Sequence, residues 1–332
     1  MSDTIVGHFG RIGHPNAWWL RKPRAVIRGH FHIPALPGRG LDVPYIEIHG
    51  RETGPRLTVL AGVHGCEYAA MAALREFVSE VDPAELRGII TAVPVVNVPA
   101  YMGRTPFVVP VDGKNLNRCF PGDPKGSFSD VLAHHVFERF IRGADYVIDL
   151  HSGDLPEAIE PVVIYDESPV SEAARRIAVA YGTQHVIRQP SDARVTTGTT
   201  SSAAADAGIP AITAEAGGSG IIDPKAVAIH VMGLRNVAAT LGMLPDDVKQ
   251  TRGQTEHQQG WSWIHSPVGG WWQPTVELGK PVSKGGLLGQ VSDLFGDVIH
   301  EVRANQAGIP MIITTSPAIA ADGLVMVLTQ EV

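Results

Sequence analysis

The stretch RLTVLAGVHGCEYAAMAALREFVSEV (residues 56–81) passes from one kind of structure to another. Its first part, 56–65, is an apolar run that predicts a buried strand ending in a glycine-flanked loop. From 66 to 81, Ala, Leu, Met and Phe recur at helical spacing, which predicts a helix. A strand that leads directly into a helix is the repeating unit of an α/β protein. Two ionisable residues, His64 and Glu67, lie at the junction.

The same alternation continues along the chain. Further strands are predicted at 88–98, 145–153 and 162–165, and helices at 129–144, 171–182 and 223–244, with Ser129 and Ser171 as N-caps. Residues 199–218 predict a helix, a Gly-Ile-Pro connection and a strand that ends at Glu215. The region 99–130 predicts a long functional loop. This alternation of strands and helices predicts an α/β fold. Its sheet is expected to be doubly wound, mixed but mostly parallel, with helices on both faces.

The two ends of the chain follow a different pattern. Residues 1–50 predict an N-terminal β segment, with strands at 25–33 and 43–50 around a Gly/Pro-rich turn. A polar stretch, 246–260, predicts a linker. Residues 255–332 predict a small all-β domain, a barrel or sandwich, after the α/β domain at 51–250. Within it, 276–296 resembles the barrel-sandwich fold of biotinyl and lipoyl carriers, but Lys280 and Lys284 lack the setting of a carrier lysine.

Composition excludes several classes of function. The chain has 332 residues and a net charge of −7 with no basic block, which argues against nucleic acid as a partner. No window approaches about 18 uninterrupted apolar residues, so no membrane span is expected. Its two cysteines, Cys66 and Cys119, do not make a disulfide framework, and no secretory signal is visible. We therefore expect a soluble, cytoplasmic protein.

Ionisable residues follow three of the predicted strands. His64 and Glu67 come after the first strand, His151 ends a later one, and Glu215 ends the last. A single histidine at a strand end is more often structural than functional. In an open α/β sheet, however, the carboxyl ends of the strands meet at one edge, where ligands bind. Convergence of these residues at that edge favours a functional site over a polar turn.

The residue types at this edge suit zinc. A catalytic zinc ion takes three protein ligands and keeps a fourth position open, and two imidazoles with one carboxylate suit its borderline softness. His64, Glu67 and His151 are the candidate ligands. Asp149, on the same face of the strand as His151, is either an acceptor behind the ligand or the cap of a neighbouring loop.

Other residues suit hydrolysis of a substrate that carries a carboxylate. Glu215 is the candidate base for a zinc-activated water; its alternative is an ion pair with a surface lysine. Arg118 and Asn117 in the long loop can hold a carboxylate. Arg104, in the same loop, is either an oxyanion stabiliser or a solvated arginine.

Four motifs together, HGCE, NLNRCFPG, DLHSG and AEAGG, resemble the succinylglutamate desuccinylase/aspartoacylase family in order and separation. This family comprises deacylating relatives of the zinc carboxypeptidases. The resemblance implies one Zn²⁺ per subunit on His64, Glu67 and His151, with Glu215 as the group that activates water. It also implies that Asn117 and Arg118 bind the carboxylate of a small N-acyl amino acid and that Arg104 stabilises the oxyanion. Separately, we expect the protein to be a homo-oligomer.

Within the family, the N-terminal β segment and the GVHG-x-E loop look most like the bacterial branch that includes the ectoine-degradation deacetylase. That branch implies N-acetyl-diaminobutyrate as the substrate. Cys66 and Asn115 depart from the residues expected at their positions, and both departures concern the substrate rather than the chemistry. The alternative functions are a zinc carboxypeptidase acting on short peptides and a non-catalytic binding protein on the same fold.

Overall fold

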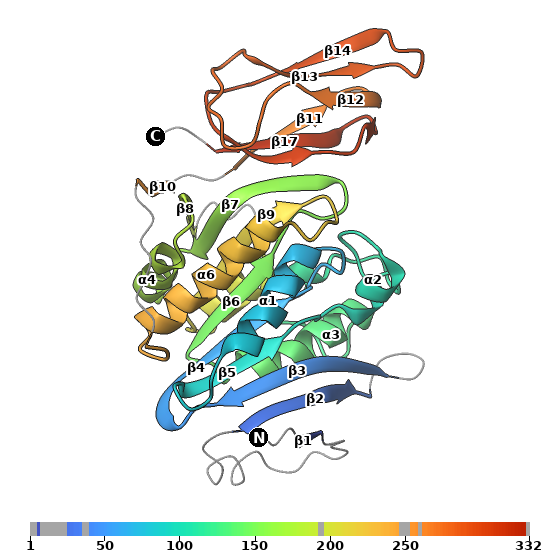
Figure 1. Cartoon of the computed structure of the whole chain (residues 1–332). Helices are drawn as coiled ribbons and strands as arrows, with labels where there is room; N and C mark the ends of the chain where they lie inside the picture. The colour runs from blue at the N-terminus through green and yellow to red at the C-terminus, as the bar shows by residue number, and fades with distance from the viewer. Residues whose placement is uncertain are drawn as a thin grey trace.

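The structure is a computed structural model that describes residues 5–6, 25–34, 40–191, 196–245, 253–257 and 261–329. It is built on one large mixed sheet (Figure 1). The main path of the sheet runs, in spatial order, β1 (Ile5–Val6), β2 (Ala25–Ile33), β3 (Leu41–His49), β5 (Arg87–Val93), β4 (Glu52–Ala61), β6 (Tyr146–His151), β9 (Ala211–Gly218), β7 (Glu157–Asp166), β15 (Pro310–Thr314), β17 (Gly323–Thr329) and β11 (Trp261–Ser266). A side branch adds β8 (His185–Gln189) to β7 and β10 (Thr255–His257) to β8.

The centre of this sheet is parallel and its flanks are not. Strands β5, β4, β6 and β9 run parallel to one another, whereas β3 pairs antiparallel with β2 and β5, and β7 pairs antiparallel with β9. The predicted α/β fold with a mixed sheet is therefore confirmed, but the sheet is parallel mainly at its centre and not over most of its strand pairs. The parallel centre brings the carboxyl ends of β4, β6 and β9 to a single edge.

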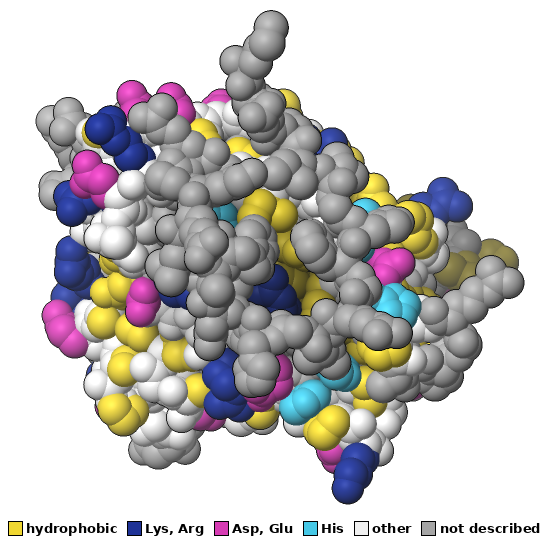
Figure 2. Space-filling model, turned by 90° about the horizontal axis from the view of Figure 1, so that it is seen from below, with side chains coloured by type: hydrophobic (Ala, Val, Ile, Leu, Met, Phe, Trp, Pro, Cys, Tyr) yellow, Lys and Arg dark blue, Asp and Glu magenta, His cyan; other side chains and the backbone are white. Residues whose placement is uncertain are grey.

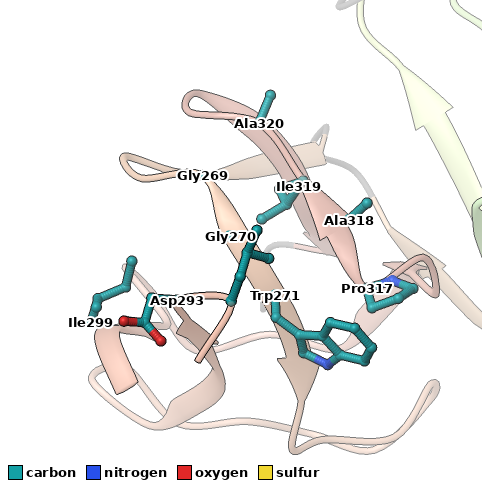
Figure 3. A pocket seen from close by; sticks show the side chains of 10 residues that line it. Gly269, Gly270, Trp271, Asp293, Ile299, Pro317, Ala318, Ile319 and Ala320 are labelled. Carbon is teal, nitrogen blue, oxygen red and sulfur yellow. The ribbon is translucent and has the colours of Figure 1, made fainter. Parts of the chain in front are cut away.

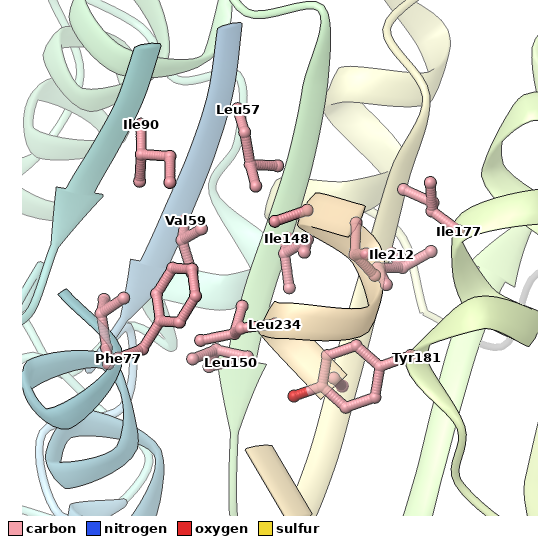
Figure 4. Close-up of a cluster of buried hydrophobic side chains, with 14 of the residues drawn as sticks. Leu57, Val59, Phe77, Ile90, Ile148, Leu150, Ile177, Tyr181, Ile212 and Leu234 are labelled. Carbon is pink, nitrogen blue, oxygen red and sulfur yellow. The ribbon is translucent and has the colours of Figure 1, made fainter. Parts of the chain in front are cut away.

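Both faces of the central strands are buried. On β4, Val59 points into a cluster with α1 (Tyr68–Glu80), α4 (Ser171–Tyr181) and α6 (Pro224–Thr240), while Leu60 points into a cluster with α3 (Phe128–Val136) and α5 (Thr200–Asp206). Figure 4 shows the first of these clusters, with β-strand residues such as Leu150 packed against Phe77 and Leu234 from the helices. Burial on two faces explains why these strands are continuous apolar runs.

The C-terminal part is all-β, as expected. A separate four-stranded sheet, in the order β14 (Val298–Arg303), β13 (Leu287–Ser292), β12 (Gly270–Pro274) and β16 (Ala318–Ile319), shares an apolar core with β11, β15 and β17. Trp272 is buried in that core, and its indole N–H donates to the Thr314 carbonyl at 2.9 Å. Because β15 pairs with β7, hydrogen bonds join this region to the α/β sheet (Figure 1). The boundaries at 51–250 and 255–332 stay predictions.

Several local predictions were wrong. Ser127, not Ser129, is the N-cap of α3, because Asp130 three residues later completes a capping box, and the Ser129 hydroxyl donates to Asp112 instead. Ser171 is the first residue of α4, whose N-cap is Val170. The strand predicted at 88–98 ends at Val93.

Four short elements were missed. The predicted loop 99–130 overlaps α2 (Val98–Gly103) and contains a 3₁₀ turn (Leu116–Arg118), while β10 lies within the predicted linker. Strand β8 was not predicted either. The rest of the linker, at 246–252 and 258–260, lies outside the described residues, as do 1–4, 7–24 and 35–39.

Charges are mixed on the surface seen in Figure 2. Among the side chains described there, dark blue Lys and Arg lie interspersed with magenta Asp and Glu, without a block of one sign. This agrees with the absence of a basic run in the sequence. No helix within the described ranges combines the length and apolarity that crossing a membrane requires.

Candidate active site

The edge formed by β4, β6 and β9 collects the candidate residues. His64 and Glu67 lie in the loop that joins β4 to α1, and His151 is the last residue of β6. Glu215 on β9 is the register partner of His151, so the two residues lie side by side on neighbouring parallel strands. Residues far apart in the sequence meet here because the strands that carry them end at the same edge.

Glu67 joins the two histidines. Its Oε1 lies 2.7 Å from Nδ1 of His64, and its Oε2 lies 2.8 Å from Nδ1 of His151. The backbone N–H of Ser152 also donates to Oε2, at 3.2 Å. The His64 and His151 ring centroids are 5.1 Å apart. Two imidazole nitrogens therefore point at the two oxygens of one carboxylate.

The other nitrogen of each ring has a fixed partner. Nε2 of His151 lies 2.8 Å from Oδ2 of Asp149, which can only accept when ionised, so Nε2 carries a proton. Nε2 of His64 lies 3.0 Å from Oδ1 of Asn115, and the same oxygen accepts the Asn117 N–H at 2.9 Å. Both rings thus donate through Nε2 and turn Nδ1 toward Glu67.

This donor set fits a zinc ion. One ligand atom from each of His64, Glu67 and His151 can be chosen so that all lie within 4.8 Å of one another. Two imidazoles with one carboxylate are a catalytic zinc ligand set, and metal-binding histidines typically donate their second N–H to a carboxylate or carbonyl oxygen. Asp149 and Asn115 supply those acceptors.

The charges within the site are strongly coupled. Burial alone would raise the pKa of Glu67, but the adjacent His151 and His64 outweigh it and lower the pKa to about 2. Burial opposes charge on His151, yet Asp149 and Glu67 raise its pKa well above the usual value. His64 shows the same balance, with Glu67 raising its pKa. The site stabilises positive charge between its carboxylates, as a cation site must.

Glu215 differs from Glu67 because it lacks a counter-charge bonded to it. Its Oε2 is buried, and no hydrogen-bond partner for it exists among the described residues. Burial raises the pKa of Glu215 well above the usual range, and Glu67 and Glu157 add to the effect. A buried carboxyl with a raised pKa and an unused oxygen is suited to take up and release a proton.

The predicted substrate-binding residues lie on the adjoining loop. The side chain of Asn117 is buried, with Nδ2 3.5 Å from Nε2 of His151 and Oδ1 3.2 Å from the Thr200 N–H. Arg118 is exposed, and its Nη1 donates to the Asn117 carbonyl at 2.6 Å. Arg104 is exposed at the left-handed C-cap of α2. Neither arginine forms an ion pair with another described residue.

The sequence did not reveal every residue that contacts this site. Asn115 contacts His64, and the hydroxyl of Thr200, at the start of α5, donates to Asp149. Phe107 lies with its ring 6.4 Å from that of His64, and its N–H donates to Asp154 at 2.7 Å. The departure at Asn115 was visible in the sequence as part of NLNR. Thr200 gave no signal, because it faces the strand that carries His151 only once α5 is packed.

A hollow also lies in the C-terminal region. It is a groove of about 790 Å³, lined mainly by apolar residues such as Trp271, Ile299 and Ile319, with Asp293 the one ionisable residue of its lining (Figure 3). Leu294 and Phe295 beside it are almost fully exposed. Asp293 alone cannot form a metal-ligand set, because no histidine or second carboxylate of the described residues lines this groove.

Two histidines and a glutamate at the carboxyl edge of a mixed α/β sheet, next to a buried and unpartnered carboxyl, are typical of metal-dependent hydrolases. The profile of the succinylglutamate desuccinylase/aspartoacylase catalytic domain matches residues 53–241. The chain belongs to this family of deacylases.

Individual relatives agree with that assignment. The N-alpha-acetyl-L-2,4-diaminobutyric acid deacetylase of Halomonas elongata is 30% identical over 269 residues, which cover 78% of this chain and 77% of the relative. The product-bound ectoine utilization protein EutE (DoeB) of Ruegeria pomeroyi superposes with a TM-score of 0.83 at 26% identity, over 92% of this chain and 95% of that one. A succinylglutamate desuccinylase/aspartoacylase from Rhodobacter sphaeroides shares the fold, with a TM-score of 0.83 at 24% identity over 97% and 100% of the two chains.

Proposed function

We propose that this protein is a zinc-dependent amidohydrolase that removes an acetyl group from a small N-acyl amino acid, with N-acetyl-diaminobutyrate as the substrate. The main support for the proposal is that the carboxylate of Glu67 contacts Nδ1 of both His64 and His151. The choice of amino acid rests on the similarity to the Halomonas elongata deacetylase.

His64, Glu67 and His151 would hold the zinc ion, with Asp149 and Asn115 fixing the orientation of the rings. A bound zinc ion supplies Lewis acidity, which polarises a carbonyl group and makes water more acidic. The histidines must be neutral at Nδ1 to act as ligands, so metal binding would require any proton held at Nδ1 to be released.

Glu215 is the proton-transfer group of this proposal. It takes a proton from the attacking water and passes it to the amine nitrogen as the amide bond breaks. Because its carboxyl is buried and has an unpartnered oxygen, no competing hydrogen bond has to break before that transfer. Arg118 and Asn117 bind the substrate's α-carboxylate, and Arg104 stabilises the oxyanion.

Metal analysis and acetate release test the proposal together. Purified protein, loaded with zinc, should contain about one ion per chain and release acetate from N-acetyl-diaminobutyrate faster than it releases the acyl group of N-acetylaspartate or N-succinylglutamate. Release of C-terminal residues from peptides without deacetylation would favour a carboxypeptidase. A chain that binds no zinc under any loading condition would overturn the metal assignment.

A further inference from the structure

A second carboxyl, that of Glu157, lies at the same edge of the sheet and has no role in the chemistry above. Strand β7 is antiparallel to β9, with Ala158 opposite Gly218 and Val162 opposite Glu215. The first residue of β7, Glu157, therefore lies at the end of the sheet where β9 finishes. Its carboxyl is close enough to Glu67, His64 and Glu215 for electrostatic interaction with each of them.

The backbone holds Glu157 firmly in this position. Its N–H donates to the Asp154 carbonyl at 3.0 Å, and its carbonyl accepts the Ser219 N–H at 2.5 Å. Two glycines pack directly against that carbonyl: a Cβ at Gly153 would lie 2.5 Å from the oxygen, and one at Gly218 would lie 2.2 Å from it. Only glycine permits this close approach, so the position of Glu157 beside the site is built into the fold.

The side chain of Glu157, in contrast, has no cationic partner. It forms no ion pair with any residue in the described part of the chain, and its only hydrogen bond there comes from the backbone N–H of Asp154, although it is half-buried. Neighbouring Asp154 provides a direct comparison, since its two oxygens accept the Phe107 and Leu155 N–H groups, each at 2.7 Å. Asp154 is thus a structural group that ties two loops together, whereas Glu157 accepts one backbone hydrogen bond and keeps acceptor capacity for a ligand.

Leaving a shielded carboxyl unpaired is unfavourable. Burial, together with the negative charges of Glu67 and Asp154, raises the pKa of Glu157 to about 7. A cation docked against the carboxylate would offset that repulsion and supply the missing hydrogen bonds. The amino group of a diamino acid is such a cation, whereas an aliphatic or acidic side chain would leave the unfavourable arrangement in place.

We propose that Glu157 is a specificity-determining residue that binds the side-chain ammonium of the substrate, so that the enzyme acts on N-acyl diamino acids in preference to neutral and acidic N-acyl amino acids. This inference rests on the proposed deacylase function. The contact between Glu157 and the ammonium is a third contact with the substrate. The other two are that of Arg118 with the α-carboxylate and that of the metal with the acyl group. Three points of attachment fix both the chain length and the charge of the amino acid.

The test compares two substrates of the same shape. Nα-acetyl-2,4-diaminobutyrate carries an ammonium where Nα-acetylnorvaline carries a methyl group. The wild-type, zinc-loaded enzyme should favour the first by about 10- to 100-fold in kcat/KM, as expected for one charge-assisted hydrogen bond. Glu157→Gln should reduce that preference to less than about threefold, mainly by raising KM for the diamino substrate.

Glu160→Gln is the matched control. Glu160 lies on the same strand but close to Gly279 and Lys280, at the junction with the C-terminal region. This variant should retain the wild-type preference. Calorimetry supplies a readout that does not depend on turnover: 2,4-diaminobutyrate should bind wild-type protein at least about tenfold more tightly than norvaline, and Glu157→Gln should bind the two equally.

Each outcome decides a separate question. A large and equal loss of kcat on both substrates in Glu157→Gln would assign this residue to proton transfer and overturn the inference. An unchanged preference in that variant would overturn it as well. Efficient hydrolysis of only neutral or acidic N-acyl amino acids would leave the deacylase function intact and reject the ammonium site. Failure to release acetate from any N-acyl amino acid would overturn the function itself.

Discussion

His151 and Asp149 share a hydrogen bond of 2.8 Å between Nε2 and Oδ2, and this bond decides which nitrogen of the histidine faces Glu67. The two residues are neighbours on one face of β6, so the strand itself holds the acceptor behind the ring. The Thr200 hydroxyl donates to the same Asp149 oxygen and holds the carboxylate in place.

Substituting Asp149→Asn should therefore weaken zinc binding. The variant keeps the shape of the side chain but loses the charge that favours the protonated Nε2, and such partners typically contribute 10- to 100-fold to metal affinity. Competition with a zinc chelator measures the change. Asp145→Asn is the control, because Asp145 lies just before β6, where its carboxylate accepts the Arg56 N–H at 2.7 Å. Equal affinity in the two variants would contradict a supporting role for Asp149.

Glu215→Gln should separate metal binding from turnover. Glutamine preserves the volume of the buried side chain but cannot transfer the proton, so kcat should fall by about 10²- to 10⁴-fold. Zinc content, measured on the same protein preparation, should stay at the wild-type level because Glu215 is not a ligand. A variant that retained close to the normal rate would require another base, and Glu157, with its raised pKa, would then be the first to test.

The sequence was sufficient to predict the three candidate ligands because of strand order. Once β4, β6 and β9 are read as parallel strands, their carboxyl ends must share an edge, and His64, Glu67, His151 and Glu215 follow directly. No knowledge of side-chain packing is needed for that step. The α/β class could be predicted for the same reason, since burial on two faces produces continuous apolar runs.

Other features depend on packing between distant segments and gave no local signal. Thr200 contacts Asp149 only because α5 packs against β6, and Asn115 reaches His64 only through the fold of its loop. Strand β8 is five residues long and contains His, Arg and Gln, so it lacks the pattern of a buried strand. The sequence contained no signal for Glu157. Its place at the site depends on the antiparallel pairing of β7 with β9, which no local pattern predicts.

Arg118→Ala should mainly raise KM, by about 10- to 100-fold, if Arg118 binds the substrate's α-carboxylate. Its guanidinium forms no ion pair with a described residue and is available for a ligand, while its bond to the Asn117 carbonyl orients it. Arg142→Ala is the control, since the exposed Arg142 pairs with Glu138 on the surface. A loss confined to kcat would contradict the role of Arg118 as a carboxylate clamp.

Replacing Glu157 should stabilise the metal-free protein at alkaline pH. The pKa of Glu157 is raised from 4.5 to about 7, by burial first and then by the nearby charge of Glu67, so the folded protein binds more protons than the unfolded chain between these values. By linkage, the free energy of unfolding falls as pH rises through this window. Above pH 7 the ionised carboxyl destabilises the fold by about 1–3 kcal/mol, and Glu157→Gln removes that contribution.

Urea unfolding of the metal-free wild type and Glu157→Gln at pH 5 and pH 8 measures this difference. The variant should gain stability relative to the wild type at pH 8 and gain much less at pH 5, where the wild-type carboxyl is still mostly protonated. Glu138→Gln provides a control of opposite sign, because the bond to Arg142 lowers the pKa of Glu138. An equal effect of Glu157→Gln at both pH values would mean that its carboxyl titrates normally. A gain confined to alkaline pH would identify Glu157 as a residue that destabilises the metal-free protein, as expected of a group positioned for a cationic ligand.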